Sequence, residues 1–208
     1  QGALTSDTIF PKHFPFVSFP EHQRLVAFLE AQRPAAVVAV APTEAPFVPV
    51  FEDDDLVFPS ATVPPSVGAR LREGGEVALQ LGGSVVAGDG VNVSARCGGD
   101  GPRWVLSAHV DSKATTPGAF DNAGSVGALL ALAQTRGHAL GAVEFVFFNG
   151  EDHYAAPGQQ AWLAANDLAE VHANVNVDGA GFVGRRSSAA ALSCPPQMER
   201  ALAQAVAA

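Results

Sequence analysis

Short apolar runs alternate with amphipathic helical patterns over the second half of the chain. The runs 104–110 and 142–148 are almost continuously apolar, which is typical of strands covered on both faces. Between them, apolar residues recur with the spacing i, i+3, i+4, i+7 and predict a helix that Asp121-Asn122 caps and Gly137 ends. The predicted apolar face of this helix consists of Val126, Leu129, Leu130 and Ala133.

The alternation continues after the second apolar run. Pro157 favours the start of a helix that contains Trp162 and Leu163, and residues 173–177 have the composition of a third strand. Strand, helix, strand, helix, strand with short connections predicts an α/β fold, in which a mostly parallel sheet is sandwiched by helices.

The first ninety residues differ from the rest, because they are rich in proline and in β-like runs. They predict four elements, namely helices at 21–33 and 66–73 and strands at 37–40 and 76–81. Residues 82–90 have the composition of a turn or linker. We therefore expect a domain boundary there, with a smaller α+β segment at 1–90 and a larger α/β domain at 91–208.

Composition and charge narrow the class of protein. Hydrophobic residues make up 48% of the 208 residues and charged residues 16%, which excludes a disordered tail and a coiled coil. The formal net charge of -9 argues against a general nucleic-acid binder, which needs a basic surface. No apolar run approaches the roughly 18 residues of a membrane span.

The start of the chain and its cysteines bear on localisation. The chain begins at Gln1 without a leader, which indicates a start produced by processing or by cloning, and we expect a secreted or extracellular protein. Cys97 and Cys194 can pair in an oxidising compartment, but two cysteines define no disulfide scaffold. Neither lies in a CxxC motif, so a cysteine zinc site is excluded.

Chemically active side chains follow the end of each predicted strand. They are His109 and Asp111 after the first strand, Glu151 and Asp152 after the second, and Asp178 after the third, with Asp121 at the start of the intervening helix. The carboxyl ends of parallel strands meet at one edge of a sheet, so we expect these side chains in one crevice. So many carboxylates repel one another unless a divalent cation is bound, and a mixed His/carboxylate set suits zinc, or cobalt or manganese.

Each of these residues has a simpler interpretation when it is taken alone. A histidine at a strand end is commonly a hydrogen-bonded structural residue, and Asp121 alone is an ordinary helix cap. Asp178 before Gly179 is a common turn residue, and Glu151-Asp152 is a solvated loop. Their joint occurrence at every strand end, however, favours a metal site.

Four motifs in this order resemble the di-zinc aminopeptidase family, which includes bacterial leucyl aminopeptidases and glutamate carboxypeptidase. The motifs are Ala108-His109-Val110-Asp111-Ser112, Gly118-Ala119-Phe120-Asp121-Asn122-Ala123-Gly124-Ser125, Phe148-Asn149-Gly150-Glu151-Asp152 and Asn176-Val177-Asp178-Gly179. The resemblance covers residues 91–208 and implies a zinc-exopeptidase fold. Residues 20–90 resemble, more weakly, part of the protease-associated domain found in many members.

The resemblance implies a role for each site residue. Asp121 would bridge two zinc ions, His109 and Asp178 would hold one of them, and Asp152 would hold the other. Asp111 would orient the His109 ring, and the Asp121–Asn122 peptide bond is expected to be cis. Glu151 would be the general base for a water activated by both zinc ions, and the expected substrates are peptides with a free N-terminus.

One ligand of the family pattern has no counterpart in the sequence. The family takes a last histidine ligand from beyond the position of Asp178, whereas His172 is the last histidine here. We therefore expect a catalytic domain cut short at its C-terminus, with at most one tightly bound zinc ion. Two alternatives stay open: a non-catalytic binding module on the same fold, and a single-zinc glutaminyl cyclase.

Overall fold

A computed structural model describes most of the chain. The described residues are 9–10, 12, 19–44, 50–51, 56–82, 84, 86–113, 116–153, 155–181, 183–184 and 194–207. The acidic stretch around Asp53 lies outside them. Contacts along the chain divide it into two compact units, residues 1–93 with 148–168 and residues 94–147 with 169–208. The predicted protease-associated character of residues 1–90 stays a prediction.

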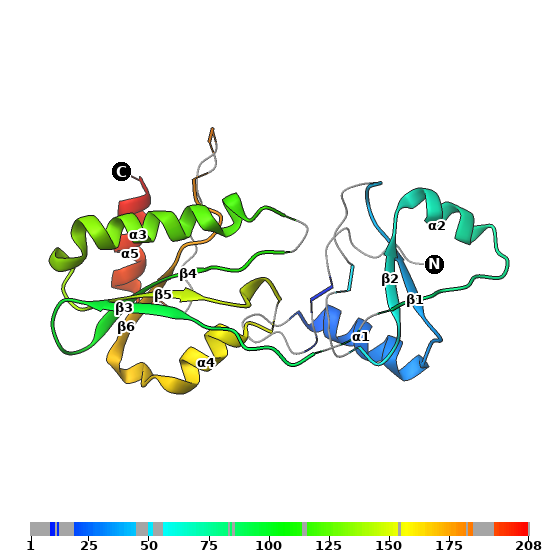
Figure 1. The fold of residues 1–208 in the computed structure, drawn as a ribbon, viewed down its shortest axis with the longest axis horizontal. Coiled ribbons are helices and arrows are strands. Elements are labelled where there is room, and N and C mark those ends of the chain that lie inside the picture. Colours follow the sequence, from blue (N-terminus) through cyan, green and yellow to red (C-terminus); the bar gives the residue numbers. More distant parts are fainter. Residues whose placement is uncertain are drawn as a thin grey trace. The chain divides into compact units, whose positions relative to one another are not determined.

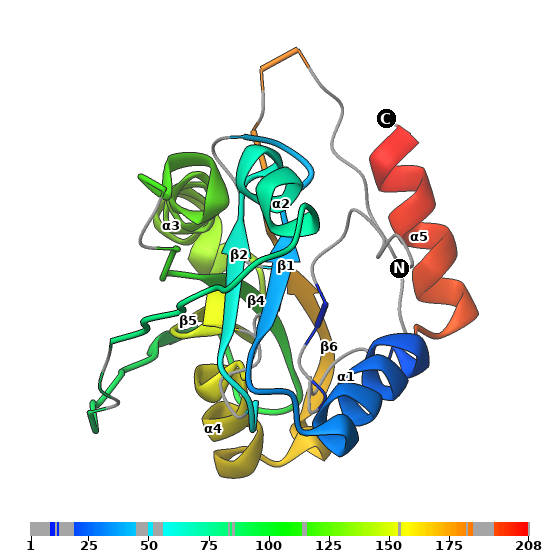
Figure 2. The same ribbon diagram turned by 90° about the vertical axis from the view of Figure 1, so that its right-hand side faces the viewer.

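The first unit contains a small parallel sheet with a helix on each side of one strand. Strand β1 (Val37–Val40) pairs in parallel with β2 (Ser60–Val63). Helix α1 (Pro20–Gln32) packs Val26 against Ala39 of β1 in one apolar cluster, whereas α2 (Pro65–Arg72) brings Gly68 against the next residue, Val40 (Figure 2). Because successive strand residues point to opposite faces, the two helices cover opposite sides of β1. The predicted helices and the strand at 37–40 are confirmed.

The predicted strand at 76–81 is wrong. Residues 74–82 form no regular structure, and they expose Val77 by 58% and Leu81 by 53%. The alternation of apolar side chains in this segment is that of a strand, but a strand also needs a neighbour for its backbone groups. Here it follows Gly74 and Gly75, which have φ of 87° and 117°, and it pairs with none of the described strands.

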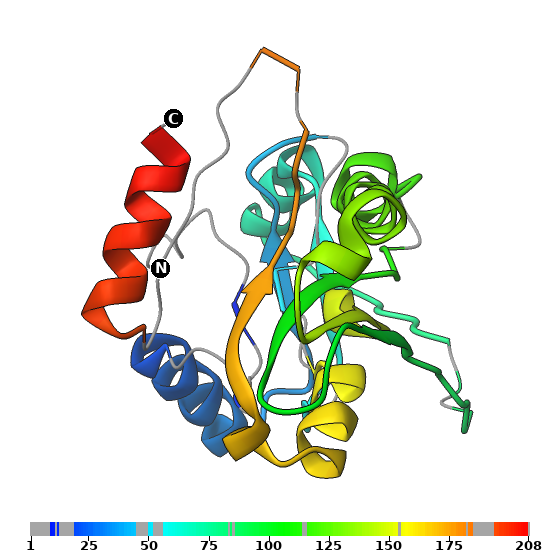
Figure 3. The same ribbon diagram turned by 90° about the vertical axis from the view of Figure 1, so that its left-hand side faces the viewer.

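The second unit is organised around a four-stranded sheet. Its strands are β3 (Val93–Cys97), β4 (Arg103–His109), β5 (Val143–Phe148) and β6 (Val171–Asn176), and their order in the sheet is β3-β5-β4-β6 (Figures 1 and 3). Strands β4 and β6 are parallel, with Ser107 opposite Asn176. All six residues of β5 are buried, as its continuous apolar run predicts. The predicted mixed α/β fold with a largely parallel sheet is confirmed.

Helix α3 (Gly124–Arg136) lies along this sheet and closes the main apolar core (Figure 1). The core consists of Ala108, Leu129, Val143, Phe145 and Phe147, with Val126, Leu132 and Ala133 packed at its border. The predicted apolar face is therefore correct except for Leu130, which is 47% exposed, while Leu132 turns inward. The helix is preceded by the turn Ala119–Ala123, in which Asp121 and Asn122 have non-helical φ and ψ. Leu132 lies three residues after Leu129 and therefore on the same face of the helix.

Two further helices are described. Helix α4 (Pro157–Ala165) begins at Pro157 as predicted and belongs to the first unit, and α5 (Pro196–Ala207) belongs to the second. None of the helices in the described part of the chain combines the length and the apolar character that a membrane crossing requires. Cys97 and Cys194 are both free thiols.

Candidate metal centre

The predicted site residues of the second unit lie where the parallel strands end. His109 is the last residue of β4 and its side chain is 2% exposed, and Asp111 follows it by two positions. Asp178 follows the end of β6 by two positions. Because β4 and β6 are parallel neighbours, both ends lie at the same edge of the sheet. The structure thus brings together side chains that are 69 positions apart (178 − 109) in the chain.

The His109 ring is held in one orientation by Asp111. Nδ1 lies 3.0 Å from the backbone carbonyl oxygen of Asp111 and 3.7 Å from its carboxylate oxygen Oδ1. A carbonyl oxygen only accepts hydrogen bonds, so Nδ1–H donates to it. In the neutral ring the lone pair is then on Nε2. The expected ring-orienting contact of Asp111 is present in the structure, made chiefly through its backbone.

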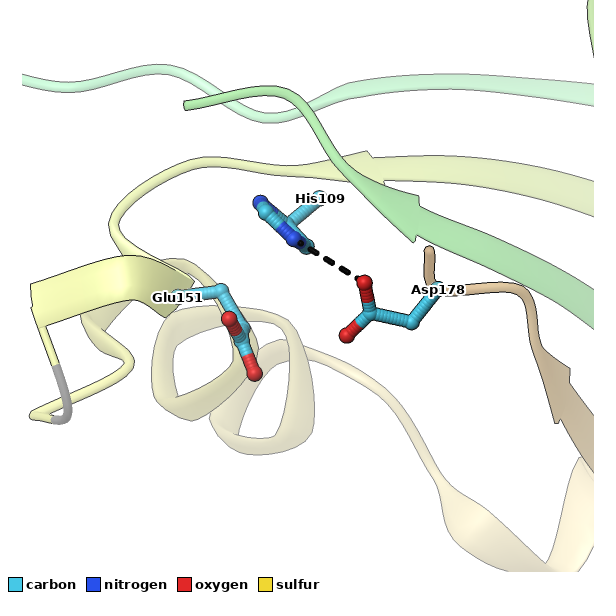
Figure 4. Close-up of side chains that lie close together, drawn as sticks. All are labelled: His109, Glu151 and Asp178. Carbon is cyan, nitrogen blue, oxygen red and sulfur yellow. Dashed lines mark ion pairs between the residues drawn. The ribbon is translucent and has the colours of Figure 1, made fainter. Parts of the chain in front are cut away.

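The Nε2 atom of His109 faces two carboxylates. It lies 2.9 Å from Oδ1 of Asp121 and 3.4 Å from Oδ1 of Asp178, and Figure 4 shows the contact with Asp178. A hydrogen bond with His109 lowers the pKa of Asp178, and the charge of His109 lowers it further, whereas partial burial opposes both effects. A nitrogen lone pair that faces two carboxylates needs a cation between them, either a proton or a metal ion. One imidazole nitrogen with carboxylate oxygens is a donor set that suits zinc.

The sequence alone suggested that Asp121 caps helix α3, but in the structure it does not. The cap position is Ala123, which makes no side-chain hydrogen bond, and Asp121 lies earlier, in the Ala119–Ala123 turn. Its φ and ψ of -120° and 91° are not helical, and its peptide bond with Asn122 is cis, as the resemblance implies. The side chain is 56% exposed and contacts His109. Asp121 is therefore free of a capping role and can serve as a ligand.

Glu151 and Asp152 follow β5 in the short 3₁₀ turn Glu151–His153. Two sets of side chains offer ligand atoms that lie within 4.8 Å of one another: His109 with Glu151 and Asp178 (Figure 4), and His109 with Asp111 and Asp152. The first set differs from the implied scheme, in which Glu151 is a base. The second set includes Asp111, whose backbone carbonyl oxygen accepts the hydrogen of His109 Nδ1, which leaves Nε2 as the ring nitrogen that can bind a metal ion.

Sequence reasoning missed the buried polar side chains that surround these ligands. Ser107, Asn122 and Ser125 are at most 1% exposed, and all three hydrogen-bond to residues on β6 or just after it. Asn122 and Ser125 stand in the quoted Asp-Asn-Ala-Gly-Ser segment, where Asn reads as a capping residue and Ser as a helix-start residue. Only the tertiary structure shows that their partners are residues 174–180.

A largely parallel sheet with His and Asp at its strand ends is compatible with a metal site, and comparison with known proteins specifies the family. The sequence model of Peptidase family M28 matches residues 92–207, and the chain belongs to this family. Among solved structures, the chain is similar in fold to an aminopeptidase from Aneurinibacillus sp. strain AM-1, with 18% identity and a TM-score of 0.50. That match covers 78% of this chain and 43% of the aminopeptidase. The comparison with curated proteins found no match.

Proposed function

We propose that this chain carries the metal centre of a zinc-dependent aminopeptidase, which removes N-terminal residues from peptides. The single observation that carries the proposal is the convergence of Asp121 and Asp178 on Nε2 of His109, in a chain that belongs to Peptidase family M28. This convergence supports a metal site because a bound cation offsets the mutual repulsion of the two carboxylates, and one imidazole nitrogen with carboxylate oxygens is a donor set that zinc favours.

Zinc would be held by Nε2 of His109 and by the carboxylates of Asp121 and Asp178. In the implied two-ion scheme Asp121 is shared and Asp152 belongs to the second ion. Bound zinc polarises a peptide carbonyl and lowers the pKa of water. The exposure of Asp121 and Asp178, whose side chains are 56% and 43% accessible, leaves room for a substrate at this position.

The protein's own residues would orient the ligands and move the proton. Asp111 fixes the His109 ring, so that Nε2 stays directed at the two carboxylates. A carboxylate oxygen of Glu151 would accept a proton from the attacking water and later donate it to the amine of the leaving peptide. Glu151 suits this role because it lies three positions after the last residue of β5 (151 − 148), so that this fully buried strand fixes where its turn begins.

A second arrangement has an observation in its favour. Glu151 lies in one ligand set with His109 and Asp178, so it is also placed to hold a single zinc ion rather than to act as a base. That arrangement corresponds to the single-zinc alternative, a glutaminyl cyclase. The two arrangements predict different effects on zinc affinity when the Glu151 carboxylate is replaced by an amide.

Glu151→Gln therefore separates the two arrangements. If Glu151 is the base, hydrolysis of an aminoacyl amide falls by about 10²–10⁴-fold while zinc measured by elemental analysis is unchanged. If Glu151 is a ligand, zinc affinity falls as well. Glu199→Gln, the same exchange on exposed helix α5, is the matched control and leaves both quantities unchanged.

Three outcomes would contradict this proposal in part or as a whole. Unchanged turnover in Glu151→Gln removes Glu151 from the reaction. Cyclisation of a substrate with an N-terminal glutamine, without release of an amino acid, replaces the peptidase by the cyclase. If the protein takes up no zinc at all, both arrangements are contradicted, and the non-catalytic binding module is the interpretation that remains.

A further inference from the structure

The side chain of Asn122 is buried and bonds to the backbone on both sides of Asp178. It is 1% exposed. Its Nδ2 donates to the carbonyl oxygen of Val177 at 3.0 Å, and its Oδ1 accepts from the backbone N–H of Gly179 at 3.2 Å. The amide thus spans the two peptide groups that flank Asp178, in the way that a neighbouring strand would.

Other backbone groups next to Asp178 are held as well. The N–H of Val177 donates to the carbonyl oxygen of Ser107 at 2.8 Å, and the N–H of Ala180 donates to Oγ of Ser125 at 3.3 Å. Residues 177–180 are therefore tied to β4 on one side and to the start of α3 on the other. Of these hydrogen bonds, the two made by Asn122 are the ones that flank Asp178 on both sides.

The position of Asn122 in the sequence links two ligands. Asp121 reaches Nε2 of His109 with its own side chain, and the adjacent Asn122 holds the backbone from which Asp178 reaches the same atom. One dipeptide thereby sets both carboxylates relative to a single imidazole nitrogen. The loop is also tight: Gly179 has a φ of 58°, and a Cβ atom there would lie 3.3 Å from the Phe120 ring.

From these contacts we propose that Asn122 is a positioning residue that holds the Asp178 carboxylate ready to bind the metal ion beside His109. The inference rests on the proposed function, because it takes Asp178 as a ligand. It goes further by assigning a residue that never touches the metal ion. Groups that orient metal ligands typically account for about 10–100-fold in metal affinity, because a loose ligand must be ordered when the ion binds.

The test uses Asn122→Asp and Asn122→Ala. The aspartate has nearly the same shape, but it replaces the Nδ2 donor by an oxygen that faces the Val177 carbonyl, whereas alanine removes both bonds. Leu129→Ala is the control, because Leu129 is buried in helix α3, just after the turn that holds Asn122, and its apolar side chain makes no hydrogen bond to residues 177–180. Thermal melting shows which of the two Asn122 variants loses about as much stability as Leu129→Ala, and that variant is the one to compare with the control.

The first measurement needs no metal. Amide hydrogen exchange in the metal-free chain, followed by NMR, is expected to accelerate at least about ten-fold at Gly179 and Ala180 in the Asn122 variants. In Leu129→Ala we expect the exchange rates of these two amides to change no more than the overall loss of stability of that variant requires. Equal acceleration in Leu129→Ala, or none in the Asn122 variants, overturns the proposal. If Asn122→Ala fails to fold, Asn122→Asp decides.

The second measurement is the affinity for Zn²⁺ alone, by competition with a chelator. We expect it to fall about 10–100-fold in the Asn122 variants and to stay near the wild-type value in Leu129→Ala. An equal fall in the control makes the role of Asn122 merely structural and overturns the proposal. If the wild-type chain binds no Zn²⁺, the proposed function fails, whereas the exchange rates still decide whether Asn122 holds the Asp178 loop.

Discussion

The buried ion pair between Arg103 and Glu144 gives the sharpest prediction about stability. The two residues lie on the neighbouring strands β4 and β5, and each side chain is 4% exposed. Arg103 also reaches Glu170 at 3.3 Å, but the Glu170 side chain is 62% exposed. Glu144→Gln keeps the shape and removes the charge, so the Arg103 guanidinium stays buried without its buried carboxylate partner; the change also weakens a 3.5 Å contact between Glu144 and the exposed Arg96.

Removing one member of a buried pair costs about 3–5 kcal/mol, because an uncompensated charge remains in the interior. Glu170 stays in place and the new amide oxygen still accepts from Arg103, so we expect the lower end, about 3 kcal/mol. For a chain of this size that corresponds to a fall of roughly 6–12 °C in Tm. Replacing both partners, as Arg103→Met with Glu144→Leu, removes the charges together and is expected to restore most of the stability.

Urea unfolding followed by tryptophan fluorescence measures these differences, since Trp104 is adjacent to Arg103 in β4. Glu30→Gln is the matched control: it breaks a pair with Lys12 of 2.8 Å whose side chains are 18% and 21% exposed. We expect that change to cost at most about 1 kcal/mol. A loss in Glu144→Gln no larger than in the control, or a double variant less stable than either single one, would refute the reasoning.

Two further predictions concern backbone space and acidity. In Gly127→Ala on helix α3 the new Cβ atom meets nothing within 4 Å, and we expect stability to rise by about 0.5–1 kcal/mol. In Gly158→Ala the new Cβ atom would lie 2.3 Å from the carbonyl oxygen of Asn149, and we expect Tm to fall. Equal melting temperatures of the two variants would contradict this prediction. Because the pKa of Asp178 is lowered in the folded chain, its carboxylate stabilises the metal-free fold at pH values above the ordinary pKa of 3.8. This stabilisation is lost as the pH falls through the lower pKa of the folded state. Urea titrations below pH 4 should therefore show a shallower acid loss in Asp178→Asn, and an unchanged slope would count against the contact with His109.

The strands that build the site were predictable because of how they are buried. A strand covered on both faces is mostly apolar, and β5 is buried at all six positions and apolar at all of them except Glu144, which pairs with Arg103. The next two strands on one side of it, β4 and β6, end at His109 and just before Asp178, and their parallel pairing brings these two ends together. The polar residues after apolar runs were thus sufficient to indicate a metal site.

What the sequence could not show is which segments become partners. Residues 76–81 have the alternation of a strand, yet they find no neighbour among the described strands. Strand β2 was missed because Ser60–Val63 is short and only half-buried, and it exists through its pairing with β1. For the same reason Asn122 was read as a helix-start residue: its partners lie 55 positions (177 − 122) away.

The strand order also determines when the sheet can form during synthesis. Strands β3 and β4 are consecutive in the chain but are separated in the sheet by β5, which ends 39 residues (148 − 109) after β4. At about 5–20 residues per second, a ribosome leaves β4 without this neighbour for roughly 2–8 s. The central place of β5 thus makes the completion of the sheet a late event in the life of the nascent chain.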